Sequence, residues 1–156
     1  MMTTTALLLL LLTITLSLGG GLYEVLVIYP NWKYDVDPQT LSGKLESSGQ
    51  NRAGKRFWPL VSPVQGLLAI INIVLAYNYV GPAHCMWLFG AIIVLVSRLI
   101  TFAYFIPEMI RKIMKPEGLE KALLQRIVKT WTSLSPLRLL PELFAWVVLA
   151  LALMKM

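Results

Sequence analysis

The sequence predicts an all-α integral membrane protein, folded as one domain of four antiparallel helices, and three observations support this fold class. Hydrophobic residues make up 57% of the 156 residues and charged residues only 14%, whereas a soluble domain has about 25% charged residues. The mean hydropathy is +0.69. The apolar residues also gather in four runs, and about 20 apolar residues suffice to cross the hydrocarbon core of a bilayer.

The first apolar run predicts a membrane-spanning helix over residues 6–29, interrupted by hydroxyl side chains, three glycines and Glu24. A cleaved signal peptide is the alternative, because residues 7–12 resemble its apolar segment. The preceding residues contain no Lys or Arg, and the apolar run continues past any cleavage site, which favours a retained helix. Pro30 and Trp32 predict that the helix ends near a membrane interface, where tryptophans gather.

The second span is predicted over residues 58–80, with Pro59 in its first turn, where proline is tolerated. Residues 31–57 before it are rich in Gly, Ser and Asp and are predicted to be a polar connector, a loop with at most one short helix. A Gly-Pro turn follows the second span, so the third span, over residues 84–106, runs antiparallel to it. Pro107 is expected to end the third span.

The second connector, residues 108–135, contains an amphipathic pattern ahead of the last span, which is predicted over residues 137–154. The apolar residues that recur at helical spacing are Leu119, Leu123, Ile127, Trp131 and Leu134. They predict an interfacial helix that lies on the membrane surface. Packing of the same face against the ends of the other helices is the alternative.

The positive charges predict the orientation in the membrane. Twelve of the fourteen Lys and Arg residues lie in or beside the two connectors, whereas Arg98 lies inside a span and Lys155 at the carboxyl end. Because cytoplasmic segments retain basic residues, both connectors are predicted to be cytoplasmic and both termini outside. This bias and attraction to anionic lipids explain the net charge of +6. Membrane lipids are the expected partners, nucleic acid is not, and self-association is left open.

The scarcity of cysteine and histidine excludes several classes of chemistry. The chain has one cysteine, Cys85, and one histidine, His84. A thiol–disulfide relay needs two cysteines, a four-ligand zinc site usually needs several Cys or His, and a bis-histidine haem would need a second chain. His84 lies at the outer turn and is expected to be interfacial. No metal and no cofactor are therefore expected.

Ionisable residues inside spans carry most of the functional information, because each is costly to insert and requires a partner. Spacings of three and four place a polar or small-residue stripe on each predicted helix. The four stripes are Thr13, Ser17, Gly20 and Glu24; Ser62, Gln65, Ala69, Asn72 and Ala76; Arg98, Thr101, Phe105 and Glu108; and Ser135, Arg138, Glu142 and Ala145. Such stripes predict a bundle whose polar faces meet while its leucines face lipid.

These stripes predict a polar pocket in the half of the bundle nearest the basic connectors. In it Arg98 pairs with Glu24, Glu142 or both, and these three are the candidate catalytic residues. The candidate ligand-binding residues are Tyr23, Gln65, Asn72, Thr101, Tyr104, Glu108 and Arg138. Two alternatives need no ligand: the charges form an ion pair that fixes helix register, or Arg98 extends to the lipid headgroups.

Several short motifs carry a family resemblance. They are Gly21-Leu22-Tyr23-Glu24, Tyr29-Pro30-Asn31-Trp32, Arg56-Phe57-Trp58-Pro59, the segment from Thr101 to Glu108, and Trp131 with Arg138. In these motifs and in its four-span layout, the chain resembles a large family of small membrane proteins of uncharacterised function that includes the fungal anthrone oxygenases. The resemblance implies a bundle that handles a hydrophobic, aromatic or quinone-like molecule.

For the fungal branch, the resemblance implies oxidation of an anthrone to an anthraquinone without an obvious metal cofactor. The chain departs from that branch between Trp131 and Arg138, where it has no histidine to act as a base. An oxygenase-like reaction here would therefore need Glu24 or Glu142 as the base and Arg98 to stabilise an enolate or phenolate. A non-catalytic structural, lipid-binding or accessory transport subunit is the competing hypothesis.

Overall fold

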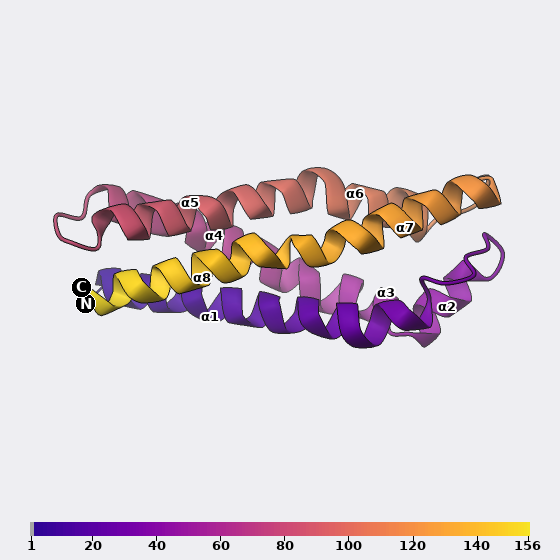
Figure 1. Ribbon diagram of the computed structural model, residues 1–156, viewed down its shortest axis with the longest axis horizontal. Coiled ribbons are helices and arrows are strands. Elements are labelled where there is room, and N and C mark those ends of the chain that lie inside the picture. Colours follow the sequence, from indigo (N-terminus) through magenta and orange to yellow (C-terminus); the bar gives the residue numbers. More distant parts are fainter. Residues whose placement is uncertain (1) are drawn as a thin grey trace. The chain divides into compact units, whose positions relative to one another are not determined.

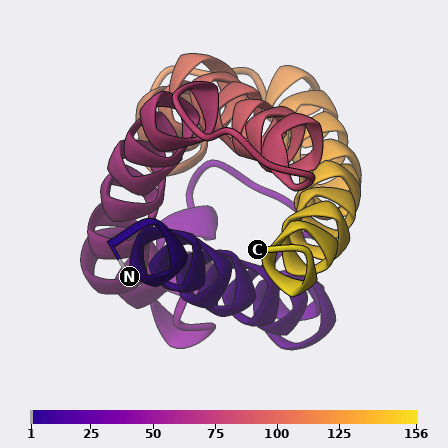
Figure 2. The same cartoon turned by 90° about the vertical axis from the view of Figure 1, so that its left-hand side faces the viewer.

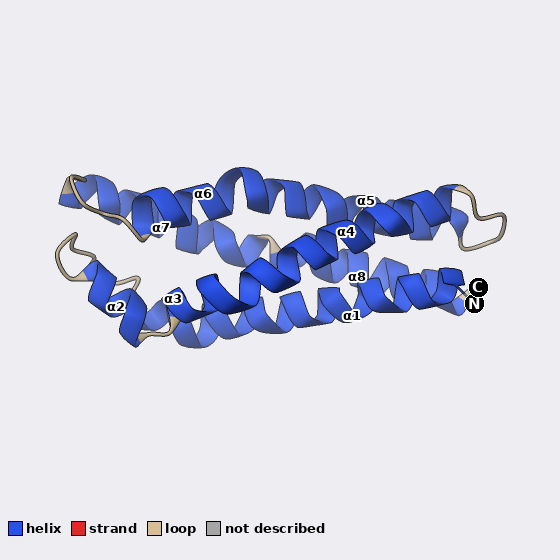
Figure 3. Ribbon diagram, turned by 180° about the vertical axis from the view of Figure 1, so that it is seen from behind, coloured by secondary structure: helices blue, strands red, loops and turns tan. Residues whose placement is uncertain are grey.

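The computed structural model describes residues 2–156, which form helices joined by short loops and turns (Figure 3). Among these residues, four helices are long and apolar enough to cross a membrane: Met2–Asn31, Gln50–Tyr77, His84–Ile113 and Lys121–Met154. The prediction of an all-α chain with four long apolar helices is confirmed. Each helix extends beyond the corresponding predicted span at one or both ends.

Each long helix consists of consecutive segments (Figure 1). The first contains α1 (Met2–Tyr23), the π-helical turn η1 (Glu24–Ile28) and the 3-10 turn η2 (Tyr29–Asn31). The second contains α3 (Gln50–Arg52), η3 (Ala53–Phe57) and α4 (Trp58–Tyr77), and is preceded by the separate short helix α2 (Leu41–Ser47). The third contains α5 (His84–Ile100), η4 (Thr101–Phe105), α6 (Ile106–Glu108) and η5 (Met109–Ile113). The fourth contains α7 (Lys121–Leu137) and α8 (Leu139–Met154).

Three of the π-helical turns end two residues before a proline, at Pro30, Pro59 and Pro107. Proline has no N–H, and its ring crowds the carbonyl four residues earlier. A π-helical turn just before the proline widens the helix and lets the chain continue. Two predictions were therefore wrong. The third helix runs through Pro107 to Ile113, and the second begins at Gln50, so that Pro59 lies in its interior.

The two connectors are also more helical than predicted. The first contains both α2 and the beginning of the second long helix, and the second contains η5 and most of α7. The apolar face of α7 buries Leu124, Val128 and Trp131 in a hydrophobic cluster with residues of other elements. Of the predicted apolar face, only Trp131 is fully buried; Leu119 and Ile127 are partly buried, and Leu123 and Leu134 are exposed. The face that packs is thus rotated by about one residue from the predicted one, and the location of α7 at a membrane surface stays a prediction.

The chain groups into two compact units, each described by itself. Unit 1 contains the residues up to Gly19, Leu60–Leu99 and Arg138–Met156. Within it, the start of α1, the end of α8 and the turn of residues 78–83 lie at one end, which faces the viewer in Figure 2. Its core joins leucines of α1 to small residues of α4, α5 and α8. All five residues of the predicted α4 stripe, Ser62 to Ala76, are buried.

Gly90 of α5 packs closely against α8 in unit 1. A Cβ atom there would lie 2.7 Å from both Cγ and Cδ2 of Leu149, a fully buried residue of α8. We expect Gly90→Ala to destabilise the protein by about 1–3 kcal/mol, because the core has no room for the methyl group. Unfolding in detergent measures the change. Gly19→Ala is the control, since its Cβ meets no atom within 4 Å, and a loss as large as that of Gly90→Ala would contradict the packing argument.

Unit 2 contains Gly20–Pro59 and Ile100–Leu137 and has an aromatic core. The rings of Tyr29, Trp32 and Trp131 lie 5.4–6.2 Å apart between centroids. Trp32 is completely buried and packs inside the core of this unit. Its predicted depth near a membrane interface stays a prediction. Its indole N–H donates to the Gln50 side-chain oxygen at 3.2 Å, which removes the usual reason for a tryptophan to face water.

Candidate functional site

Unit 1 contains an ion pair between Arg98 and Glu142, which join α5 to α8. The Nη2 atom of Arg98 contacts Oε1 of Glu142, and both side chains are only 1% exposed. The hydroxyl of Ser62 on α4 accepts a weak hydrogen bond from Nη1 of Arg98 at 3.5 Å. The predicted pairing of Arg98 with Glu142 is confirmed. A buried pair needs such close contact, because both ions have been removed from water.

Gln65 of α4 is the second notable residue of unit 1. Its side chain is fully buried, and neither its carbonyl oxygen nor its NH2 group has a hydrogen-bond partner. The Nε atom of Arg98 likewise lacks a hydrogen bond. The neighbouring Gly66 brings α4 close to the Arg98 stem, since a Cβ there would lie 4.0 Å from the Cγ of Arg98. Each unsatisfied buried group costs about 1–3 kcal/mol of stability. The Gln65 amide and the Arg98 Nε atom could therefore each still form a hydrogen bond to a further group.

Asn72 also lies in unit 1, but its amide already forms hydrogen bonds with other residues of the protein. Its NH2 group donates to the carbonyl oxygens of Ala6 at 3.0 Å and Leu68 at 2.8 Å. Its own oxygen accepts a hydrogen bond from the indole of Trp87 at 2.9 Å. Asn72 therefore links α1, α4 and α5, and this structural role accounts for its burial without a ligand.

Glu24, the third candidate catalytic residue, is the centre of a polar network in unit 2. Its Oε1 atom accepts hydrogen bonds from the Trp58 indole at 2.7 Å and the Gln50 amide at 3.1 Å. Its Oε2 atom accepts one from the Tyr29 hydroxyl at 3.2 Å. A carboxylate is an acceptor-only group, and bonds of this kind are strengthened by its charge. Both oxygens of Glu24 are thus held by donors from its own unit.

The Glu24 network extends to α7, because the Tyr29 hydroxyl also lies 2.8 Å from the Ser135 hydroxyl. Gln50 and Trp58 are central to it, and neither is among the predicted site residues. Gln50 gave no signal, since a single glutamine in a polar connector has no periodic apolar context. Trp58 follows Arg56 and Phe57 in one of the short motifs and could have been paired with a carboxylate on that basis.

Three other predicted ligand-binding residues of unit 2 are less buried than Glu24. Tyr23 is 58% exposed, so it does not line a buried site within this unit. Tyr104 is half-buried and packs edge-on against Phe105, with 5.1 Å between ring centroids. Glu108 is half-buried and forms an ion pair with Lys112 at 2.8 Å.

The last two predicted ligand-binding residues differ in burial. Thr101 is 2% exposed, at the beginning of the π-helical turn η4 in unit 2. Arg138 is half-buried in unit 1 and is the single residue between α7 and α8. Of the predicted site residues, unit 1 therefore pairs Arg98 with Glu142 and buries Gln65 three residues after Ser62, the α4 partner of Arg98. Glu24 has its own set of partners in unit 2.

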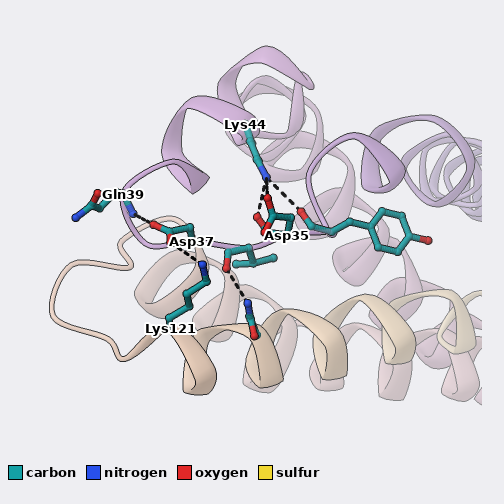
Figure 4. A network of polar contacts seen from close by, with 8 residues as sticks. Asp35, Asp37, Gln39, Lys44 and Lys121 are labelled. Atoms are coloured by element: carbon teal, nitrogen blue, oxygen red, sulfur yellow. Dashed lines mark hydrogen bonds and ion pairs between the residues drawn. The ribbon is translucent and has the colours of Figure 1, made fainter.

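A surface network ties the loop of residues 34–39 to α7 (Figure 4). The Asp37 carboxylate accepts the backbone N–H of Gln39 at 3.0 Å and contacts Lys121 Nζ at 3.0 Å. The Gln39 N–H, followed by Lys121, lowers the pKa of Asp37, and the hydrogen bond to Asp37 raises the pKa of Lys121. Lys44 reinforces the loop by donating to the backbone oxygen of Asp35 at 2.7 Å.

These pKa shifts set the pH range of the loop contact. The lowered pKa of Asp37 contributes stability above its unfolded value of about 3.9, which is lost as the pH falls through the folded value. The raised pKa of Lys121 contributes below about 10.4 and is lost as the pH rises through the folded value. We expect Asp37→Asn to accelerate amide hydrogen exchange in residues 34–39 equally at pH 6 and pH 8. The melting temperature should barely move, because the pair is exposed; acceleration at only one pH would contradict the assignment.

Among residues 2–156, no group of three or more His, Cys, Asp or Glu side chains is arranged to hold a metal ion. The two buried carboxylates are accounted for by protein partners, Arg98 for Glu142 and the three donors for Glu24. Comparison of the chain with protein-family models, with curated proteins and with solved structures finds no match.

Proposed function

We propose that the protein is a multi-pass membrane protein, an antiparallel four-helix bundle that binds a small hydrophobic molecule beside the Arg98–Glu142 pair. Its membrane location is supported by the four long apolar helices and by the inverted polarity of unit 1. Large apolar side chains such as Leu60 and Leu67 are exposed there, whereas Gln65, Arg98 and Glu142 are buried. A helix with polar groups inside and leucines outside is suited to lipid.

The proposed topology places both termini outside and both connectors in the cytoplasm, as the positive-inside rule favours. The single exposed cysteine provides a direct test. A membrane-impermeant maleimide applied to intact cells should label Cys85, at the start of α5, in the wild-type protein. In a Cys85→Ser protein that carries Ser47→Cys in the first connector, labelling should require permeabilised cells. The reverse pattern would contradict this orientation.

The single observation that carries the ligand proposal is the unpartnered amide of Gln65, adjacent to a buried ion pair. A ligand with a carbonyl or hydroxyl group would hydrogen-bond to Gln65 and to the Arg98 Nε atom, and would offset the cost of burying them. Because these side chains are buried, binding must move α4 away from α5 and α8 to admit the ligand. The apolar remainder of the ligand would then lie among the helices, as in other ligand sites of helix bundles.

The resemblance to anthrone oxygenases extends the proposal to proton abstraction next to a carbonyl group. Glu142 is better placed than Glu24 to act as the base, since both Glu24 oxygens already accept hydrogen bonds from Trp58, Gln50 and Tyr29. In this scheme Glu142 takes a proton from carbon, and the Arg98 guanidinium stabilises the resulting enolate oxygen. Molecular oxygen would be the oxidant of the enolate.

The ligand proposal is tested by native mass spectrometry of the detergent-purified protein. We expect a discrete non-lipid adduct on the wild-type protein that is absent from the double variant Arg98→Met, Glu142→Leu. The double variant removes both charges and retains side-chain bulk, so it is expected to fold. Melting and helix content are measured on the same samples as a control.

The competing function is that of a structural or accessory subunit, and the complete burial and direct contact of Arg98 and Glu142 favour it. An ion pair of this kind can fix helix register without any ligand. If the wild-type and double-variant spectra contain only the same heterogeneous lipids, the ligand-binding proposal fails and the structural role stands.

A further inference from the structure

Three cationic side chains, Arg52, Lys55 and Arg56, form what we call the basic turn. They lie at the beginning of the helix Gln50–Tyr77, and all three are exposed. Residues three and four apart share one side of a helix, so the three charges project together. The rest of this helix, residues 57–77, contains no charged side chain. The basic turn thus directly precedes a long apolar segment of the same helix.

The orientation of the basic turn is fixed by the two aromatic residues that follow it. The Phe57 ring lies so close to Gly20 that a Cβ on Gly20 would be 2.5 Å from its Cε1 atom. The Trp58 indole donates to the buried Glu24 carboxylate at 2.7 Å. Phe57 and Trp58 also pack edge to face, with 5.0 Å between ring centroids. Because these rings anchor one side of the helix to the first long helix, the three cations remain on the accessible side.

The charges of the basic turn are not neutralised by a carboxylate contact. None of the ion pairs found among residues 2–156 includes Arg52, Lys55 or Arg56. The closest acidic residue in the sequence, Glu46, accepts a hydrogen bond from Asn51 at 3.0 Å. The other dense group of exposed cations, Arg111, Lys112 and Lys115, differs in that Lys112 pairs with Glu108.

We propose that the basic turn binds the phosphate group of an anionic phospholipid in the cytoplasmic leaflet. Two guanidinium groups and an ammonium group offer the forked and single donors that phosphate oxygens accept. Basic residues next to an apolar helix are attracted to the negative surface potential of that leaflet. The acyl chains of the lipid would extend into the hydrocarbon core of the bilayer. This inference rests on the membrane location proposed above.

The test is a native mass spectrometric titration of the purified protein with dioleoyl phosphatidylglycerol and, separately, dioleoyl phosphatidylcholine. We expect wild type to bind the anionic lipid more tightly. The triple variant Arg52→Gln, Lys55→Gln, Arg56→Gln should weaken binding of that lipid by about 100-fold, about fivefold per side chain, and leave phosphatidylcholine binding unchanged. The control is Arg111→Gln, Lys112→Gln, Arg126→Gln, which removes the same net charge elsewhere and should weaken it less than about threefold.

The outcomes separate a site from general electrostatic attraction. Equal losses in the two triple variants, or no preference of wild type for the anionic lipid, would overturn the proposal. If the triple variant does not fold, single variants of the three basic residues are used. Each should then bind the anionic lipid about fivefold more weakly than wild type. Failure of the protein to remain in phosphatidylcholine vesicles after alkaline carbonate extraction would instead count against the membrane location itself.

Discussion

Glu142→Leu is expected to destabilise the protein by about 3–5 kcal/mol, the largest effect of any single substitution proposed for unit 1. The change leaves the Arg98 guanidinium buried in contact with apolar atoms and without its counter-ion. The hydrogen bond from that group to Ser62 is 3.5 Å long and cannot replace the ion pair. Unfolding in mixed detergent micelles measures the free-energy change.

The double variant Arg98→Met, Glu142→Leu is the matched control for this prediction. Replacing a buried ion pair by apolar side chains of similar volume is often neutral or stabilising, so the double variant should recover most of the loss. Recovery would identify the unpaired charge as the cause of the single-variant effect. A double variant as unstable as Glu142→Leu would show that Glu142 contributes chiefly through packing, and the ion-pair account would be wrong.

Glu24→Leu is expected to destabilise the protein by about 2–4 kcal/mol, because it removes the common acceptor of two buried donors and one half-buried donor. The Trp58 indole, the Gln50 amide and the Tyr29 hydroxyl each lose a hydrogen bond. Individual polar contacts in membrane proteins contribute about 0.6 kcal/mol on average and up to about 1.7, and the three act together. Unfolding in detergent measures the free-energy change.

Glu24→Gln separates the charge of this residue from its shape. The amide keeps one oxygen acceptor but turns its NH2 group toward a donor, so it should lose about half as much stability as Glu24→Leu. Removal of Tyr29's hydroxyl in Tyr29→Phe should cost less again, because it breaks only the contacts to Glu24 and Ser135. Equal stability of wild type and Glu24→Leu would contradict the role of Glu24 as the centre of the network.

The sequence predicted the features that depend on composition and on helical spacing. Four apolar runs identify the long helices, because length and hydropathy alone suffice. The stripe from Ser62 to Ala76 predicts the buried face of α4, since side chains three and four apart share a face. The same argument predicts a buried carboxylate partner for Arg98 but leaves open whether it is Glu24, Glu142 or both, and the structure shows the pair with Glu142.

The sequence did not predict the features that depend on local backbone adjustment or on contacts distant in the chain. Pro107 predicts a helix end, yet a π-helical turn lets the helix continue there. The full burial of Trp32 likewise depends on a distant residue, because an oxygen from Gln50, eighteen residues later, satisfies its N–H. Gln50 lies in a segment without a periodic pattern, so only the folded structure brings it to Glu24.

The substitution Gln65→Leu tests the central claim most directly, because ligand binding and structural support predict opposite signs. The measurement pairs native mass spectrometry with unfolding on the same purified sample. If Gln65 binds the ligand, its replacement by leucine has two expected results. The ligand-free protein becomes more stable, because an unsatisfied buried amide is removed, and the adduct disappears from the mass spectrum. A variant that is less stable than wild type and carries an unchanged adduct would contradict the claim that Gln65 binds the ligand.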